Sequence, residues 1–358
     1  MANIFDYLDW RDIELEKLPF NEVDNLILSR LSYFPFDGVV STEPVSLRYA
    51  YEQYKKIKNK ASILQKEDAD FFPKMAYSKR FGEIKLVNYV NRLDIIQEKQ
   101  FSAVTVILPD NTIYVSFRGT DDTIVGWKED FNMSFSECIA AQVDAKKYLQ
   151  DIAERFSQKI RVGGHSKGGN LAIYASIFAK EEFKGRIIEV YNNDGPGFHE
   201  NIINSKEYEN MLSIIHTYIP QTSIIGRLLE HKEKCEIIKS TQTGIMQHDL
   251  YSWQVLGDKF VKDKLTNASK YIDKTITDWI QDIDNTQREE FINNLFEILN
   301  TTQAKTLGEL TKNKFETSKA IIKAYTNMDE ETKKMMTKTL NSLISIATSN
   351  ISISKNTK

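Results

Sequence analysis

The chain has 358 residues, of which 41% are hydrophobic and 27% charged, and its formal net charge at pH 7 is −3. This length and composition predict one large globular domain with a smaller module beside it. A weakly acidic chain is not typical of nucleic-acid-binding proteins, so we expect no nucleic-acid partner.

Cys138 and Cys235 are the two cysteines of the chain. They are too few for a disulfide framework and do not have the spacing of metal ligands, so we expect a reducing compartment. We also expect that the protein uses no cofactor. The first six residues lack the basic and apolar regions of a secretory signal peptide. No segment has the roughly 18 consecutive apolar residues of a transmembrane helix. We therefore expect a cytoplasmic protein without a transmembrane segment.

The expected elements begin with helices over residues 20–31 and 46–56. Strand-like and helical segments then alternate. The expected strands cover 84–90, 104–108, 112–117, 160–163, 187–191, 214–219 and 236–238, and the expected helices 138–156 and 168–180. Residues 109–111 form a turn of Pro, Asp and Asn between two of the strands. This alternation predicts a mostly parallel sheet with helices on both faces.

The composition changes near residue 258. All Pro, His and Cys residues precede it, and so do all glycines except Gly308. Later apolar residues recur at helical spacing, as in Trp279, Ile280, Ile283, Phe291, Leu295, Phe296 and Leu299, and the pattern continues over 307–325 and 335–347. We therefore expect a catalytic domain over 1–257 and a helical module over 258–358. This module packs on the catalytic domain or on itself; the alternative is an arm that contacts a partner or a membrane surface.

The segment 161–172 carries the chemistry. It contains Gly164-x-Ser166-x-Gly168, the pattern of a nucleophile elbow. In such an elbow the serine occupies a sharp strand-to-helix turn, and side chains two residues before and after it would collide with backbone. A β-branched strand precedes the motif and a helix rich in small residues follows it. We therefore predict that Ser166 is a nucleophile; a glycine-rich turn with an inert serine is the alternative.

Acyl transfer also needs donors for the developing oxyanion. The segment Phe117-Arg118-Gly119-Thr120 reads as a strand that ends in glycine before a hydroxyl residue. We expect the N–H of Thr120, with or without its Oγ1, to meet the oxyanion together with the N–H of Lys167. The Lys167 ammonium has two interpretations, attraction of an acidic group on the substrate or simple solvation.

These motifs, with Trp127 and Asp130, resemble the class three (fungal-type) lipases. The longer Gly-His-Ser-Lys-Gly-Gly-Asn-Leu-Ala form is more similar to a bacterial family of lipase-like α/β-hydrolases of unassigned substrate. The resemblance covers roughly residues 20–257. It implies an α/β-hydrolase fold and an acyl-ester hydrolase with a Ser-Asp-His triad and no metal.

The fold places the triad in the chain order serine, acid, histidine. His248 follows the last expected strand, on a loop that can fold back over the elbow, and is the preferred base. His231 and His199 are the alternatives. His165 and His216 suit structural roles, since the first lies within the elbow and the second in the middle of a strand.

The acid is less obvious. The class three position, after the strand at 214–219, carries no carboxylate, and the sequence departs from that pattern there. Asp194 ends the preceding strand before a Gly-Pro turn, which resembles the acid position of the pancreatic-type lipases. We predict Asp194 as the acid, with Asp249 as the alternative and an ordinary turn role as the other interpretation of Asp194.

The sequence thus predicts an esterase or lipase-like hydrolase that acts on a small-molecule or lipid acyl ester. A thioesterase or acyltransferase on the same fold remains an alternative, because these enzymes differ only in the acceptor that reaches the acyl-enzyme. A non-catalytic interaction protein on a hydrolase scaffold is the third hypothesis.

Overall fold

The computed structural model describes residues 2–57, 65–121, 123–266, 274–275, 278, 282–306, 309 and 314–342. The chain divides into two compact units. The first contains Met1–Leu93, Phe101–Gly119 and Ala141–Thr266, and the second contains Asp94–Gln100, Thr120–Ala140 and Asn267–Lys358. Each unit is described by itself below.

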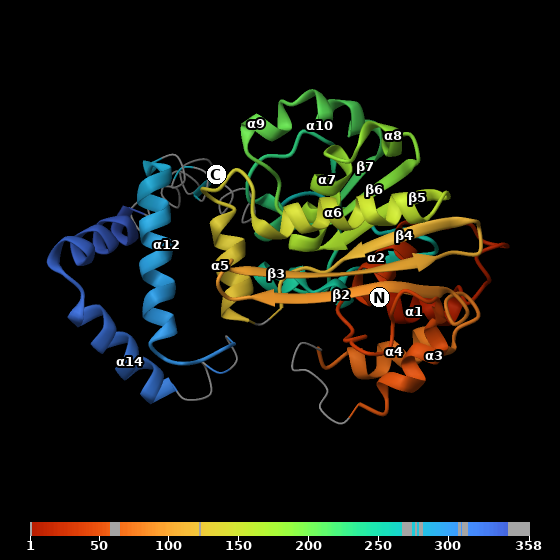
Figure 1. Cartoon of the computed structure of the whole chain (residues 1–358), viewed down its shortest axis with the longest axis horizontal. Coiled ribbons are helices and arrows are strands. Elements are labelled where there is room, and N and C mark those ends of the chain that lie inside the picture. Colours follow the sequence, from red (N-terminus) through yellow and green to blue (C-terminus); the bar gives the residue numbers. More distant parts are fainter. Residues whose placement is uncertain are drawn as a thin grey trace. The chain divides into compact units, whose positions relative to one another are not determined.

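The central sheet has eight strands in the order of the sequence. The strands are β1 (Val45–Ser46), β2 (Lys85–Asp94), β3 (Lys99–Ile107), β4 (Thr112–Phe117), β5 (Lys159–His165), β6 (Ile187–Asn193), β7 (Ile215–Pro220) and β8 (Cys235–Ile238). β1 pairs with β2, and β3 with β4, in antiparallel fashion, whereas β4 to β8 are parallel. Figure 1 shows β2 and β3 running in opposite directions as a hairpin. The seven strands expected from the sequence are therefore present, in a mostly parallel sheet.

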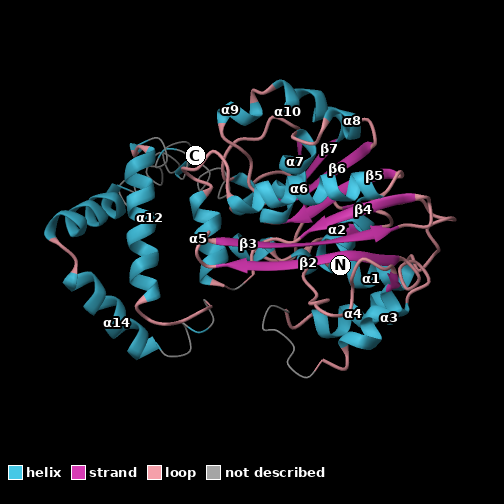
Figure 2. Cartoon of the chain, viewed as in Figure 1, coloured by secondary structure: helices cyan, strands magenta, loops and turns pink. Residues whose placement is uncertain are grey.

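The helices of this unit are shown in cyan in Figure 2. They are α1 (Ile4–Trp10), α2 (Glu22–Leu31), α3 (Leu47–Tyr54), α4 (Asp68–Tyr77), α6 (Ala140–Arg155), α7 (Lys167–Ile177), α8 (Glu181–Lys184), α9 (Glu200–Ile203) and α10 (Lys206–Met211). Short 3-10 turns follow: η1 (Leu212–Ile214), η2 (Ile225–Arg227), η3 (Gly244–His248) and η4 (Leu250–Ser252). The four long helices expected in this part of the sequence correspond to α2, α3, α6 and α7.

The helices cover both faces of the sheet for different reasons. From β4 to β7, each connection leads to the next strand of the sheet, always in the same direction across it. Because such connections are right-handed, their helices α6, α7 and α10 all lie on one face. The opposite face is covered by α2, which precedes the sheet in sequence and contacts β4 and β5. Adjacent glycines of β5 mark the two faces, since a Cβ on Gly163 would meet Asn25 of α2 and a Cβ on Gly164 would meet Gly168 of α7.

The core of this unit combines apolar side chains with buried ion pairs. Apolar residues of α1, α2, α3 and α4 pack together with Tyr114, Tyr191 and Trp253 in one cluster. Arg30 of α2 pairs with Asp68 of α4, and both side chains are almost fully buried. The paired charges hold α2 to α4, which follows it in the chain.

The second unit contains α5 (Ile124–Asn132), α12 (Asn285–Asn300), α14 (Lys314–Asn327) and a further helical segment over residues 330–342. Ile124 of α5 packs in a cluster with Ile292 and Phe296 of α12. Most of the described residues after 285 are therefore helical, as expected. Of the expected helical pattern, Trp279, Ile280 and residues 307–308, 310–313 and 343–347 lie outside the described residues.

The division of the chain into compact units differs from the expected single boundary after residue 257. The first unit runs to Thr266 because β9 (Val255–Leu256) pairs with β10 (Lys259–Phe260) and Phe260 is buried. The second unit takes in α5 because the apolar face of α5 packs on α12. The prediction that residues 1–257 form the catalytic domain stays a prediction. Of the helices that the structure describes, none combines the length and apolar character needed to span a bilayer.

Candidate active site

Ser166 lies in the sharp turn between β5 and α7. Its backbone has φ +60° and ψ −136°, a left-handed conformation that costs free energy in a residue other than glycine. The flanking glycines allow this turn. A Cβ on Gly164 would lie 2.3 Å from the carbonyl carbon of Gly168, and one on Gly168 would lie 2.2 Å from the carbonyl oxygen of Phe117. The close approach expected from the sequence motif is present at both positions.

The sheet register brings Asp194 beside the elbow. His165, the last residue of β5, pairs with Asn193, the last residue of β6, so that Ser166 and Asp194 directly follow a paired position. The Ser166 N–H donates to the Asn193 carbonyl at 2.9 Å. Asp194 is fully buried and has φ +54°. Two strained residues therefore lie next to each other at the carboxyl edge of the sheet.

His248 joins these residues from a distant part of the chain. It ends η3, and its Nδ1 lies 2.7 Å from Oδ2 of Asp194. The His248 side chain is 24% exposed, so one edge of the ring is accessible while the other contacts the buried carboxylate. The carboxylate selects the tautomer with the proton on Nδ1, which leaves Nε2 as a base. Ser166 Oγ makes no hydrogen bond within the described part of the chain, and such bonds commonly tighten only when substrate binds.

Ser223 is a member of this site that the sequence did not reveal. Its hydroxyl donates to Oδ1 of Asp194 and accepts from the N–H of Gly226. Ser223 lies on the loop after β7, where the class three pattern would have its acid. The sequence contained one signal for this residue, which was the lack of a carboxylate in that loop. In the structure the hydroxyl of Ser223 lies there instead, beside the carboxylate of Asp194, which follows the neighbouring strand β6.

His165 anchors the loop that carries His248. Its Nε2 donates to the backbone carbonyl of His248 at 2.7 Å, its Nδ1 accepts from the Tyr33 hydroxyl at 3.2 Å, and the two imidazole rings are 4.5 Å apart. Burial and the nearby charge of His248 hold the pKa of His165 well below its usual value of 6.5. His165 therefore stays neutral beside His248. Its expected structural role agrees with these contacts.

The remaining titratable candidates have other partners. Nδ1 of His231 lies 2.9 Å from Glu233; burial opposes ionisation of Glu233, but this hydrogen bond and those from hydroxyl groups lower its pKa to about 2. His216 stacks on Tyr191, with ring centroids 5.1 Å apart.

His199 is the N-terminal cap residue of α9. Asp249, the alternative acid, caps η4 by accepting the Tyr251 N–H, and burial raises its pKa. Of the acids considered from the sequence, Asp194 is thus the one whose carboxylate the structure places on the His248 ring.

The residues expected around the oxyanion have distinct surroundings. Gly119 lies against the elbow, since a Cβ there would be 2.8 Å from Cβ of Ser166. Lys167 is the first residue of α7, so its N–H belongs to the helical turn whose amides lack intrahelical partners. The Lys167 side chain is only 1% exposed, so the interpretation of a solvated ammonium is wrong. Thr120 belongs to the second unit, and its Oγ1 donates to Asp130.

The comparisons with solved structures are weak in overall geometry. The native Rhizomucor miehei lipase propeptide complex is 19% identical with a TM-score of 0.34, and the match covers 43% of this chain and 57% of that chain. M37 lipase is 14% identical with a TM-score of 0.36, and the match covers 57% of this chain and 69% of that chain. The chain thus spans little more than half the length of the first of these lipases. No curated protein sequence matches the chain.

The sequence itself matches a family over most of its length. Residues 75–297 match the Mbeg1-like family, a range of 223 residues out of 358. This range contains the elbow, Asp194 and His248, together with the parallel strands that carry them. The sheet topology and the elbow are those of an α/β-hydrolase, and the chain belongs to the Mbeg1-like family.

Proposed function

We propose that this protein is a serine hydrolase that cleaves acyl esters through a triad of Ser166, His248 and Asp194. The observation that carries the proposal is the pairing of His248 Nδ1 with the buried Asp194 carboxylate beside a strained nucleophile elbow. A buried carboxylate, an imidazole with one exposed edge and an elbow serine are the three groups that acyl-enzyme chemistry needs.

In this mechanism Oγ of Ser166 attacks the acyl carbon while Nε2 of His248 takes the hydroxyl proton. The tetrahedral intermediate then collapses, and His248 returns the proton to the departing alcohol. Water, deprotonated by His248, hydrolyses the acyl-enzyme and regenerates Ser166. Asp194 holds the ring orientation and stabilises the imidazolium that forms twice in the cycle. Because His165 stays neutral, it adds no like charge beside that imidazolium.

The oxyanion is stabilised by backbone N–H groups in this proposal. The N–H of Lys167 lies at the N-terminus of α7, where the helix dipole also favours negative charge. The N–H of Thr120 is the second donor. The Thr120 hydroxyl is not needed for this role, since it already donates to Asp130 at 2.5 Å.

The test is covalent labelling of the full-length protein by a fluorophosphonate probe, followed by hydrolysis of nitrophenyl esters across a series of acyl lengths. We expect Ser166→Ala to remove both labelling and hydrolysis while the unfolding midpoint stays close to that of the wild type, because the strain of the elbow resides in its backbone. Labelling that persists in Ser166→Ala, or a well-folded wild type that neither labels nor hydrolyses any ester, would contradict the proposal.

A further inference from the structure

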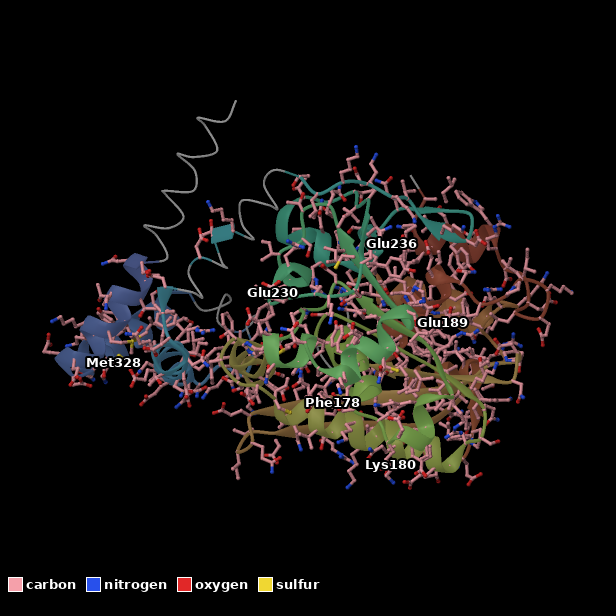
Figure 3. The ribbon with its side chains drawn as sticks, turned by 90° about the horizontal axis from the view of Figure 1, so that it is seen from above. Phe178, Lys180, Glu189, Glu230, Glu236 and Met328 are labelled. Carbon is pink, nitrogen blue, oxygen red and sulfur yellow. The ribbon has the colours of Figure 1, made fainter. Side chains whose placement is uncertain are left out.

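A second cluster of reactive side chains lies on the segment that leads into β8. Glu230 forms a bridge with Phe198, and Cys235 pairs with Thr217 of β7. The chain between these two positions is therefore fixed at both ends. Glu230 and Glu236, which flank the segment, are labelled in Figure 3. Alternate residues of this segment are His231, Glu233 and Cys235.

These three side chains converge. One ligating atom from each of His231, Glu233 and Cys235 lies within 4.8 Å of the other two. The side chains of His231 and Glu233 are 5% and 1% exposed. The carboxylate of Glu233 is held in place from outside the cluster, since Tyr208 donates to its Oε2 and Thr217 to its Oε1, each at 2.5 Å. Hydroxyl groups that fix a carboxylate in this way are typical supports of a metal ligand.

The second observation concerns the other nitrogen of the His231 ring. Nδ1 lies 2.9 Å from Glu233, whereas Nε2 is buried and has no hydrogen-bond partner in the part of the chain that the structure describes. Buried polar atoms are nearly always satisfied, so each exception asks for an explanation. Among the described residues the ring is therefore held by Glu233 alone, so Nδ1 can exchange this hydrogen bond for an ion shared with the carboxylate while the ring proton resides on Nε2.

We propose that His231, Glu233 and Cys235 bind a single zinc ion. An imidazole nitrogen, a carboxylate oxygen and a thiolate sulfur form a donor set that suits zinc, and three protein ligands leave a fourth tetrahedral position for water or an external ligand. The ion stabilises the connection between α10, β7 and β8, which contribute Tyr208, Thr217 and Cys235. This proposal departs from the expectation of no metal, which rested on the resemblance to lipase-like hydrolases and on the spacing of the cysteines.

The test titrates Co²⁺, a spectroscopic substitute for zinc, into full-length protein from which metals have been removed by a chelator. We expect saturation at one equivalent, with a near-ultraviolet charge-transfer band that reports a thiolate–cobalt bond, and loss of that band when zinc is added. The chain offers a matched control because it has two cysteines: Cys235→Ser should lose the band, and Cys138→Ser should keep it. Tyr208→Phe should weaken cobalt affinity roughly 10- to 100-fold, the usual effect of removing a support of a metal ligand.

Absence of the band at one equivalent of cobalt, or an equal band in wild type and Cys235→Ser, would overturn the proposal. If Cys235→Ser does not fold, the rate of cysteine alkylation in the wild type tests the site instead. Zinc should slow the alkylation of Cys235 and leave that of Cys138 unchanged. Equal alkylation rates of Cys235 with and without zinc would overturn the proposal. Fluorophosphonate labelling of the same samples reports on Ser166 separately, so the zinc site and the proposed hydrolase activity fail or stand independently.

Discussion

The Nε2 atom of His165 lies 2.7 Å from the backbone carbonyl oxygen of His248, and the two imidazole rings are 4.5 Å apart. A residue next to the proposed nucleophile thus holds the loop of the proposed base. The hydroxyl of Tyr33 on the other ring nitrogen fixes the orientation of His165. The elbow and the base loop are therefore linked by one hydrogen-bonded unit.

This link predicts the effect of His165→Phe. Phenylalanine keeps a ring in the space but cannot donate to the His248 carbonyl, so the base loop loses one hydrogen bond, worth about 1 kcal/mol. We expect kcat for a short nitrophenyl ester to fall by roughly 10-fold while KM changes little, because His165 orients the base and does not contact substrate. Tyr33→Phe should have a smaller effect in the same direction. An unchanged kcat in His165→Phe, measured by steady-state kinetics, would show that the loop is held by other contacts.

The low pKa of His165 predicts a pH dependence of stability. Because burial and the His248 charge disfavour its protonation, the folded protein binds fewer protons at this residue than the unfolded chain does. As pH falls below about 6.5, the unfolded state is therefore favoured, and the free energy of unfolding decreases by up to about 1.4 kcal/mol per pH unit. Above pH 6.5 the effect is absent.

Urea unfolding at pH 7.5, 6.5 and 5.5 measures this slope, and the same series on His165→Asn isolates the contribution of His165. The variant should lose less stability than the wild type between pH 6.5 and 5.5. Parallel pH profiles for the two proteins would contradict the assignment of a neutral, buried His165.

The acid assignment is tested by comparing the two carboxylates that the sequence offered for this role. Asp194 contacts Nδ1 of His248, whereas Asp249 caps η4. We expect Asp194→Asn to lower kcat by roughly 10⁴, since an amide can favour the wrong imidazole tautomer and no longer stabilises the imidazolium. Asp249→Asn should leave kcat within a few-fold of the wild type. If the two effects on steady-state kcat are reversed, the acid role belongs to Asp249.

Ser223 gives an independent probe of the Asp194 carboxylate. In Ser223→Ala the buried Oδ1 loses a hydrogen bond to a charged group, which is worth about 1.5–3 kcal/mol. If the carboxylate reorients, we expect kcat to fall by about 10- to 100-fold. If it keeps its orientation without this hydrogen bond, we expect the unfolding free energy to fall by about 1.5–3 kcal/mol instead. Kinetics and urea unfolding of this single variant together decide between the two outcomes, and a variant with neither change would exclude any supporting role for Ser223.

The end of the first unit predicts a difference between two truncated chains. Residues 1–266 retain Phe260, which is buried against Tyr218 and Trp253, and the hydrogen bond from Lys239 to Val261. Residues 1–257 lose both. We expect the longer fragment to be more stable by at least about 3 kcal/mol, the usual effect of removing a buried aromatic side chain, and to hydrolyse short-chain esters.

Both fragments lack α12, so they expose apolar residues of α5 such as Ile124 and Trp127. We therefore expect both to aggregate more readily than the full chain in size-exclusion chromatography. Thermal unfolding compares their stabilities. Equal unfolding midpoints would show that residues 258–266 contribute nothing to the first unit, and a folded 1–266 fragment without esterase activity would show that residues 267–358 complete the active site.

Much of the fold was predictable because it depends on local patterns. Seven strands and the helices between them were expected from the alternation of strand-like and helical segments, from β-branched residues and from turn residues. All seven strands are present in the sheet, and the expected helices are present beside it. Which helix covers which face was not predictable from those patterns. That depends on the strand order, since five parallel strands in sequence order place their crossover helices on one face and leave the other to α2.

The elbow was determined by the sequence itself. Side chains at positions 164 and 168 would collide with backbone within a few residues of Ser166 or on the adjacent strand β4, so glycine is required at both positions. The surroundings of the proposed base were decided only by tertiary structure. Asp194, Ser223 and His248 come from three loops that are far apart in sequence, and the sheet register, the loop after β7 and the His165 anchor bring their side chains together. The convergence of His231, Glu233 and Cys235 likewise required the structure, since their spacing alone does not show that their ligating atoms face one another.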